Sequence, residues 1–138
     1  MDILILEDNI SRQKSFKRLL IGNNVAIVDS TKSCIELLKN KTWDIIFLDH
    51  DLNGQAFVKS GPNTGFEVAE FMAENPQFKP KHIFCHSLNT DGVKNILKKL
   101  ELSFEEFYKP YCWLDERGMD LLLKHLNVKF INDQKTFL

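Results

Sequence analysis

The chain has 138 residues, of which 43% are hydrophobic and 27% charged, and its formal net charge at pH 7 is -1. This length fits one domain that buries a core without disulfides or a structural metal, and the charge indicates no strongly basic nucleic-acid surface. The 3 cysteines are an odd number and form no CxxC pair, which argues against a disulfide framework and against a zinc ribbon. Because we find no signal segment and no membrane-spanning apolar run, we expect a cytoplasmic protein in a reducing compartment.

Residues 1–63 alternate short apolar runs with segments whose apolar residues recur at helical spacing. Glycine and asparagine at positions 22–24 stop the first helical segment. In chain order we expect a strand at Asp2–Leu6, a helix at Ile10–Ile21, a strand at Val25–Val28, a helix capped by Ser30 or Thr31, a strand at Trp43–Leu48 and a loop at Asn53–Asn63.

The same alternation continues over the rest of the chain. In order, we expect a helix that starts at Thr64 and ends at Pro76–Pro80, a strand at His82–Cys85, a helix at Asn89–Leu100, a weaker fifth strand at Phe104–Tyr108 and a last helix at Asp115–Leu126. Residues 127–138 are expected to be a tail, in which Val128–Ile131 could add a strand.

Strands and helices that alternate at this spacing predict repeated βαβ units and a parallel sheet. The strands are continuously apolar, which is typical of a sheet covered by helices on both faces. We therefore expect an α/β, flavodoxin-like three-layer sandwich with a five-stranded sheet of order 2-1-3-4-5. No linker divides the chain, so residues 1–138 are expected to form one domain with a core at about 1–126.

Polar residues follow the predicted strands at their carboxyl ends, where open parallel sheets bind ligands. They are Glu7 and Asp8, then Asp49, His50 and Asp51, then His86 and Ser87, and finally Lys109. Up to four carboxylates in one crevice would repel one another unless a cation compensates them. Either Mg²⁺ or Lys109 could supply that positive charge.

These motifs carry a resemblance to a known family. The sequences ILILEDN and FLDHDL, a hydroxyl residue after the fourth strand and Lys109-Pro110 resemble the receiver domains of bacterial response regulators. DHDL at Asp49–Leu52 and HSxN at His86–Asn89 resemble a divergent branch, the cyclic-phosphate processing receiver-like domains. That resemblance implies the handling of nucleotide cyclic or terminal phosphates in RNA repair or conflict systems of bacteria and phages.

The resemblance also implies roles for single residues. Glu7, Asp8 and Asp49 would hold Mg²⁺ or Mn²⁺, and Asp49 would also be the phospho-acceptor of a signalling receiver. Ser87 would be the strand-four hydroxyl, although His86 could occupy that position instead, and Lys109 would sense the phosphate. The acids could otherwise cap helices or pair with Lys109 and Arg12.

The two histidines at the strand ends allow acid–base chemistry. Because histidine titrates near neutral pH, His50 and His86 could flank a phosphate as base and acid. Each could instead only bond a neighbouring acid or a carbonyl group. Asp51 could orient either imidazole, and Asn89 could cap its helix or contact the ligand. The aromatic residues at 107–113 could pack or stack a base.

Three functions follow from these residues. The first is a metal-dependent phosphodiesterase that hydrolyses a nucleotide or RNA-end cyclic phosphate, with His50, His86 and Asp49 as catalytic residues and Asp51, Ser87, Asn89 and Lys109 as ligand-binding residues. The second is a stand-alone receiver phosphorylated on Asp49, with a protein partner. The third is a pseudo-receiver that binds a nucleotide or a protein without turnover. No membrane contact is expected, and the oligomeric state is not predicted.

Overall fold

A computed structural model describes residues 1–135 of the chain, with side chains for residues 1–127. Four parallel strands form one sheet in the order β2-β1-β3-β4. The strands are β1 (Asp2–Leu6), β2 (Asn24–Val28), β3 (Ile45–Leu48) and β4 (His82–Cys85). The α-helices are α1 (Ile10–Leu19), α2 (Thr31–Asn40), α3 (Gly65–Glu74), α4 (Thr90–Lys99), α5 (Phe104–Phe107) and α6 (Glu116–Lys135), and two 3₁₀ turns lie at Pro76–Phe78 and Tyr111–Trp113.

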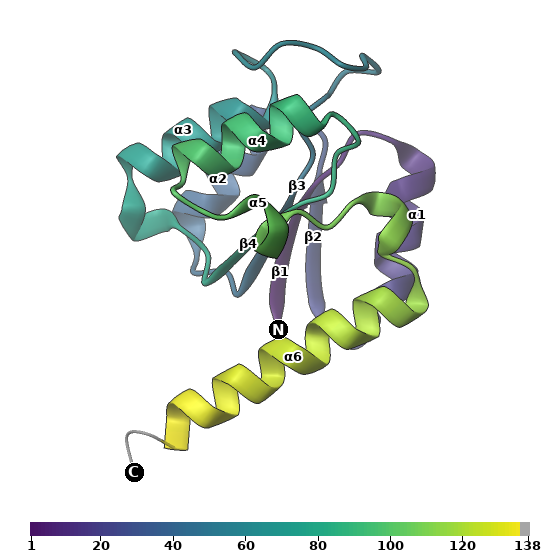
Figure 1. Ribbon diagram of the computed structural model, residues 1–138, viewed down its shortest axis with the longest axis vertical. Coiled ribbons are helices and arrows are strands. Elements are labelled where there is room, and N and C mark those ends of the chain that lie inside the picture. Colours follow the sequence, from purple (N-terminus) through teal and green to yellow (C-terminus); the bar gives the residue numbers. More distant parts are fainter. Residues whose placement is uncertain (136–138) are drawn as a thin grey trace.

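Helices cover both faces of the sheet, as the apolar strands predicted (Figure 1). Alternate side chains of each strand enter two separate cores. Leu4, Leu6, Ile46 and Leu48 pack with α2, α3 and α4, whereas Ile3, Ile5, Ile45 and Phe47 pack with α1 and the first half of α6. The predicted three-layer α/β architecture is confirmed.

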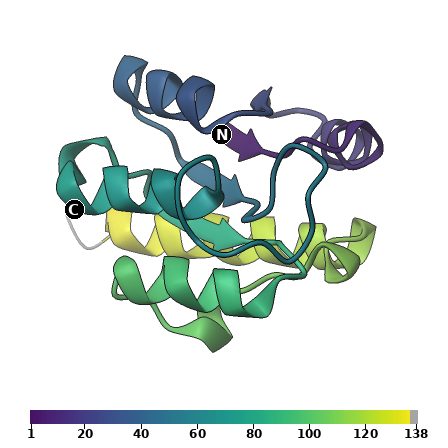
Figure 2. The same cartoon turned by 90° about the horizontal axis from the view of Figure 1, so that it is seen from above.

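The chain after β3 arches over the carboxyl ends of the strands, and Figure 2 shows this segment in front of the sheet. It lies between Leu48 and Gly65 and contains the predicted loop. Asn9, Thr64 and Asn89 cap the helices that follow three of the strand ends, and each cap accepts a hydrogen bond from a backbone N–H of its own helix. These caps fix the helix starts around the rim of the sheet.

The predicted fifth strand is wrong in its main part. Phe104–Phe107 forms the short helix α5, and only Tyr108 makes an isolated parallel bridge to Cys85. Phe104, Phe107 and Tyr108 recur at helical spacing, and a strand here would carry Glu105 and Glu106 in the sheet. The sheet therefore has four strands within the described residues.

The last helix is longer than predicted. It runs on to Lys135, so Val128–Ile131 lies within α6 and is not a strand. The sequence has no glycine or proline between Gly118 and the end of this helix to stop it. Among the described residues, we found no helix with the length and apolar character that crossing a bilayer requires.

Candidate functional site

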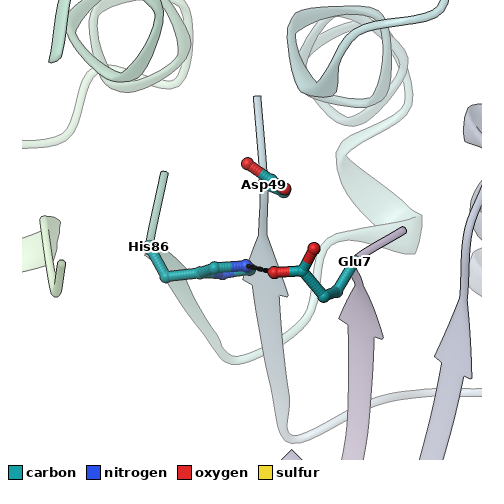
Figure 3. Close-up of side chains that lie close together, drawn as sticks. All are labelled: Glu7, Asp49 and His86. Atoms are coloured by element: carbon teal, nitrogen blue, oxygen red, sulfur yellow. Dashed lines mark hydrogen bonds and ion pairs between the residues drawn. The ribbon is translucent and has the colours of Figure 1, made fainter. Parts of the chain in front are cut away.

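Glu7, Asp49 and His86 come from three neighbouring strands and occupy the same level of the sheet (Figure 3). The last register pairs are Leu6 with Leu48 and Leu48 with Cys85. Each of the three site residues directly follows one of these positions, so all three project to the α1 side by strand alternation. All three side chains are buried.

Glu7 is the most heavily bonded side chain of the group. Its Oε1 accepts hydrogen bonds from Arg12 Nε at 2.8 Å and from His86 Nε2 at 3.1 Å, and its Oε2 accepts one from Asn9 N at 3.0 Å. Burial by itself raises the pKa of Glu7, but these partners outweigh it and lower the pKa to about 2. Glu7 is therefore an anion at neutral pH.

Asp49 has the opposite environment. Its Oδ2 is buried without a hydrogen-bond partner, and Arg12 Nη2 lies 3.7 Å away, too far for a direct hydrogen bond. Burial raises the pKa of Asp49 to about 7, and the charge of Glu7 acts in the same direction, while His86 and Arg12 oppose it. The side chain is thus poised between a neutral acid and a carboxylate that needs a cation.

His86 has one bonded ring nitrogen and one without a hydrogen bond. Nε2 faces Glu7 Oε1, and Nδ1 is buried without a partner among the described residues. The ring packs edge-on against Phe16, with 5.1 Å between the ring centroids. If Nε2–H donates to Glu7, then Nδ1 carries the free lone pair, so this contact selects one tautomer.

These three residues fit a divalent metal ion. Glu7, Asp49 and His86 each offer a ligand atom, and the three atoms lie within 4.8 Å of one another. Ligands on one ion at about 2.1 Å are separated by roughly 3–4 Å, so a small movement would close the site. The unpartnered Asp49 Oδ2 is the oxygen that such an ion would satisfy.

The structure places the predicted metal ligand Asp8 outside this group. Its Oδ2 accepts a hydrogen bond from Gly54 N at 2.8 Å, and the residue lines the neighbouring cavity. The third member of the group with Glu7 and Asp49 is therefore His86, where the sequence analysis expected Asp8.

A cavity of about 560 Å³ opens beside the three residues. That volume is in the range of small-molecule sites. Its wall contains acids, one arginine, and the polar residues before α4: Asp8, Arg12, Asp49, Asp51, His86, Ser87 and Asn89. Arg12 was expected only as an ion-pair partner, yet among the described residues it is the one arginine or lysine of this wall. Its position in the first turn of α1, five residues after Glu7, is the signal that sequence analysis passed over.

His50 does not reach this cavity. It directly follows Asp49, so it points to the other face of the sheet and lies fully buried there. Its Nδ1 is 2.7 Å from Asp51 Oδ1 and its Nε2 is 2.8 Å from Ser60 Oγ. A Cβ on Gly92 of α4 would overlap the imidazole, so this glycine makes room for it. The structure does not bring His50 and His86 to a shared phosphate, because only His86 lines the cavity.

We call the group His50, Asp51, Ser60 and Asn89 the loop clasp. Asn89 Nδ2 donates to Asp51 Oδ1 at 3.0 Å and to Val58 O at 3.0 Å. Burial opposes ionisation of Asp51, but hydrogen bonds from His50, Asn89 and the Phe57 N–H lower its pKa. The clasp therefore ties the loop after β3 to the start of α4. Asn89 is both the expected cap and a member of this network.

Ser87 and Lys109 have different surroundings. Ser87 lines the cavity, and its Oγ accepts a hydrogen bond from Asn89 N at 3.1 Å. Lys109 is absent from the cavity wall, and its Nζ lies 5.2 Å from the centre of the Trp113 ring. Its position depended on a fifth strand that forms only one bridge. The strand register places His86 beside Asp49, with Ser87 one residue further on.

Comparisons with known proteins agree with this fold. A sequence profile described as the cyclic-phosphate processing receiver domain matches residues 3–102. No curated protein sequence matches the chain. Among solved structures, a CheY-like receiver domain from Methylobacillus flagellatus has a TM-score of 0.64 at 23% identity, covering 90% of this chain and 96% of that one.

Two further receivers show the same fold. The chemotaxis response regulator CheY4 of Vibrio cholerae has a TM-score of 0.65 at 18% identity, with coverage of 90% of this chain and 96% of that one. The Mn²⁺-bound form of response regulator Rcp1 has a TM-score of 0.61 at 16% identity, with coverage of 86% of each chain.

Proposed function

This chain belongs to the family of cyclic-phosphate processing receiver domains, and from that premise we propose that it binds a divalent metal ion and hydrolyses a nucleotide or RNA-end cyclic phosphate. The observation that carries the proposal is the convergence of Glu7, Asp49 and His86 in one buried group beside the cavity. In that group Asp49 Oδ2 and His86 Nδ1 are buried polar atoms without hydrogen-bond partners, and a metal ion and a reacting water would supply partners for them.

Asp49 and Glu7 are the proposed carboxylate ligands. When bound, the ion would polarise a phosphoryl oxygen as a Lewis acid. Carboxylate oxygens suit both Mg²⁺ and Mn²⁺. Mn²⁺ is the first ion to test, because the Mn²⁺-bound form of response regulator Rcp1 has the same fold.

Arg12 and Ser87 are the proposed phosphate-binding residues. The side chain of Arg12 is about one-third exposed, and its guanidinium contacts both Glu7 and Asp49 at the cavity wall. A planar guanidinium matches two phosphate oxygens at once. Ser87 precedes the first turn of α4, where backbone N–H groups favour an anion.

His86 is the proposed general base. Glu7 orients its imidazole so that Nδ1 can take a proton from water. The water oxygen forms a bond to phosphorus while one phosphorus–ribose oxygen bond breaks. The imidazolium then returns the proton to the leaving ribose oxygen, and the product is a phosphomonoester. His50 is a positioning residue in this scheme, since it holds the loop from the opposite side of the sheet.

The test is turnover of a panel of 2′,3′-cyclic mononucleotides with Mn²⁺ or Mg²⁺, followed by ³¹P NMR, which separates cyclic diesters from monoesters. We expect His86→Gln and Asp49→Asn to abolish conversion, and Lys124→Ala on the exposed side of α6 to leave it unchanged. A wild-type protein that converts no member of the panel with either ion contradicts the proposal.

The signalling alternative predicts a different outcome. A receiver phosphorylated on Asp49 would form an adduct there with beryllofluoride. The placement of Lys109 beside Trp113 gives this alternative no support, because the expected phosphate-sensing lysine does not line the cavity. A protein that forms the adduct but turns over no cyclic phosphate would favour the signalling function, and one that binds nucleotides without turnover would favour the pseudo-receiver.

A further inference from the structure

Exposed apolar side chains surround the candidate cavity. In the part of the chain whose side chains are described, seven large apolar residues are exposed, and three of them, Ile10, Phe57 and Leu88, line this one cavity. They come from three separate segments: the start of α1, the loop after β3 and the turn before α4. Exposed apolar side chains gathered at one cavity are typical of a contact surface for a ligand. We call these three residues the apolar rim.

Phe57 is the most exposed of the three, at 74%, and its backbone is unusual. Its φ angle is 54°, in the left-handed region that bulky residues rarely adopt. Packing does not explain this conformation, because the ring is exposed to solvent. A disfavoured conformation that serves no core contact points to a functional role for the side chain.

The loop clasp holds Phe57 in this conformation. The Phe57 N–H donates to Asp51 Oδ2 at 2.6 Å, and the other oxygen of the same carboxylate is bonded to His50 and Asn89. Asn89 also bonds the carbonyl oxygen of Val58, the next residue. The side chains of Asp51 and Asn89 thus fix the backbone on both sides of one exposed ring.

We propose that the apolar rim is a stacking surface for one nucleobase, with Phe57 as its main contact. The inference rests on the proposed function, since it places the base beside the cavity that would hold the phosphate. Purine and pyrimidine faces stack on aromatic rings with little base preference. Asp8 and Asp51 in the cavity wall are not ligands of the proposed ion and would repel the further phosphates of a strand that runs through the cavity. The exposed ring and these two acids together favour a single nucleotide, or the terminal nucleotide of an RNA, over a base-free cyclic phosphodiester or an internal stretch of a strand.

The experiment compares two product-like ligands with the full chain and Mn²⁺, so that turnover does not interfere. Adenosine 3′-monophosphate carries a base and glycerol phosphate does not. Isothermal titration should show the nucleotide binding roughly ten-fold more tightly to the wild type, as expected for one base stacked on an aromatic ring. Phe57→Ala should remove this preference and leave glycerol phosphate binding unchanged, and Phe57→Trp should retain the preference.

Leu121→Ala is the matched control, because Leu121 is exposed at 53% and is absent from the cavity wall. Equal binding of the two ligands, or an unchanged preference in Phe57→Ala, would overturn the inference. A tetranucleotide with a 3′-phosphate that binds ten-fold more tightly than the mononucleotide would overturn the assignment to one base. If the protein keeps the base preference but hydrolyses no cyclic phosphate, the result contradicts the proposed function and leaves the stacking surface standing.

The loop clasp gives a second test. His50→Ala should reduce nucleotide affinity as Phe57→Ala does, without changing the affinity for glycerol phosphate, because His50 acts only through the loop. If His50→Ala does not fold, Ser60→Ala is the alternative, because it removes one bond of the loop clasp at a partly exposed residue. It should also reduce the preference for the nucleotide over glycerol phosphate. Clasp variants that fold and keep the full base preference would contradict the positioning role.

Discussion

Asp49→Asn should make the metal-free protein more stable at pH 8, although it removes a site residue. The pKa of Asp49 is raised from its ordinary 3.8 to about 7, mainly by burial. At about 1.4 kcal/mol for each tenfold change in proton affinity, this corresponds to at most about 4 kcal/mol. Relaxation around the charge reduces the value, so we expect a gain of about 2–4 kcal/mol for the neutral asparagine.

The pH dependence of this effect has a definite sign. Between pH 4 and 7 the folded protein keeps a proton on Asp49 that the unfolded chain has lost. The free energy of unfolding of the wild type should therefore fall as the pH rises through this window and level off above it. Glu7 acts elsewhere, because its pKa is lowered from 4.5 to about 2, so its stabilising effect is lost only as the pH falls below about 4.5.

Urea unfolding followed by circular dichroism, with a chelator present, measures both effects. The wild type should lose stability between pH 5 and 8, and Asp49→Asn should lose much less. Asp29→Asn, at an exposed carboxylate, is the control and should follow the wild type. A wild-type stability that stays constant or rises over this range, or an Asp49→Asn variant that is less stable at pH 8, would refute the argument.

Three further outcomes follow from the site and the loop clasp. Excess Mn²⁺ at pH 8 should raise the melting temperature of the wild type and not that of Asp49→Asn; equal shifts would place the ion elsewhere. Gly92→Ala should destabilise the protein by about 1–3 kcal/mol in urea unfolding, because its Cβ would displace the His50 ring, whereas an ordinary helix position would gain stability. Phe57→Gly should weaken nucleotide binding but leave the free energy of unfolding equal or raise it by up to about 1 kcal/mol. Glycine adopts the left-handed conformation without strain, and this gain offsets the larger conformational entropy that glycine loses on folding. A clear loss of stability in Phe57→Gly would show that the ring packs in the folded state.

Much of the fold was predictable because it depends on local pattern. Continuous apolar runs at Asp2–Leu6 and at Ile45–Leu48 can be buried only in a sheet covered on both faces, and this predicted the layers and the rim where polar residues gather. The fifth strand was wrong because an apolar segment this short is ambiguous between strand and helix. The helical spacing of Phe104, Phe107 and Tyr108, with two glutamates between them, favours the helix that forms.

The candidate site was predictable in its residues and less so in its arrangement. The prediction placed polar residues at the correct strand ends but did not assign them to faces. The prediction for Lys109 followed from a fifth strand of which only the Tyr108 bridge forms, and the lysine side chain lies beside Trp113. Ser60 and Gly92 contact His50, from which they are separated by 10 and 42 residues along the chain. No local sequence pattern indicates such contacts.

Strand alternation explains why the sequence at the end of β3 is Asp-His-Asp. Asp49 faces α1, where it meets Glu7 and His86 from the neighbouring strands at the same level. The next residue must face the other way, and there His50 has Ser60 and the space beside Gly92. Asp51 follows at the cavity edge and bonds both His50 and the Phe57 backbone. A single tripeptide can therefore serve the group of Glu7, Asp49 and His86 on one face of the sheet and hold the loop from the other face. Moving the histidine by one position would remove both arrangements together.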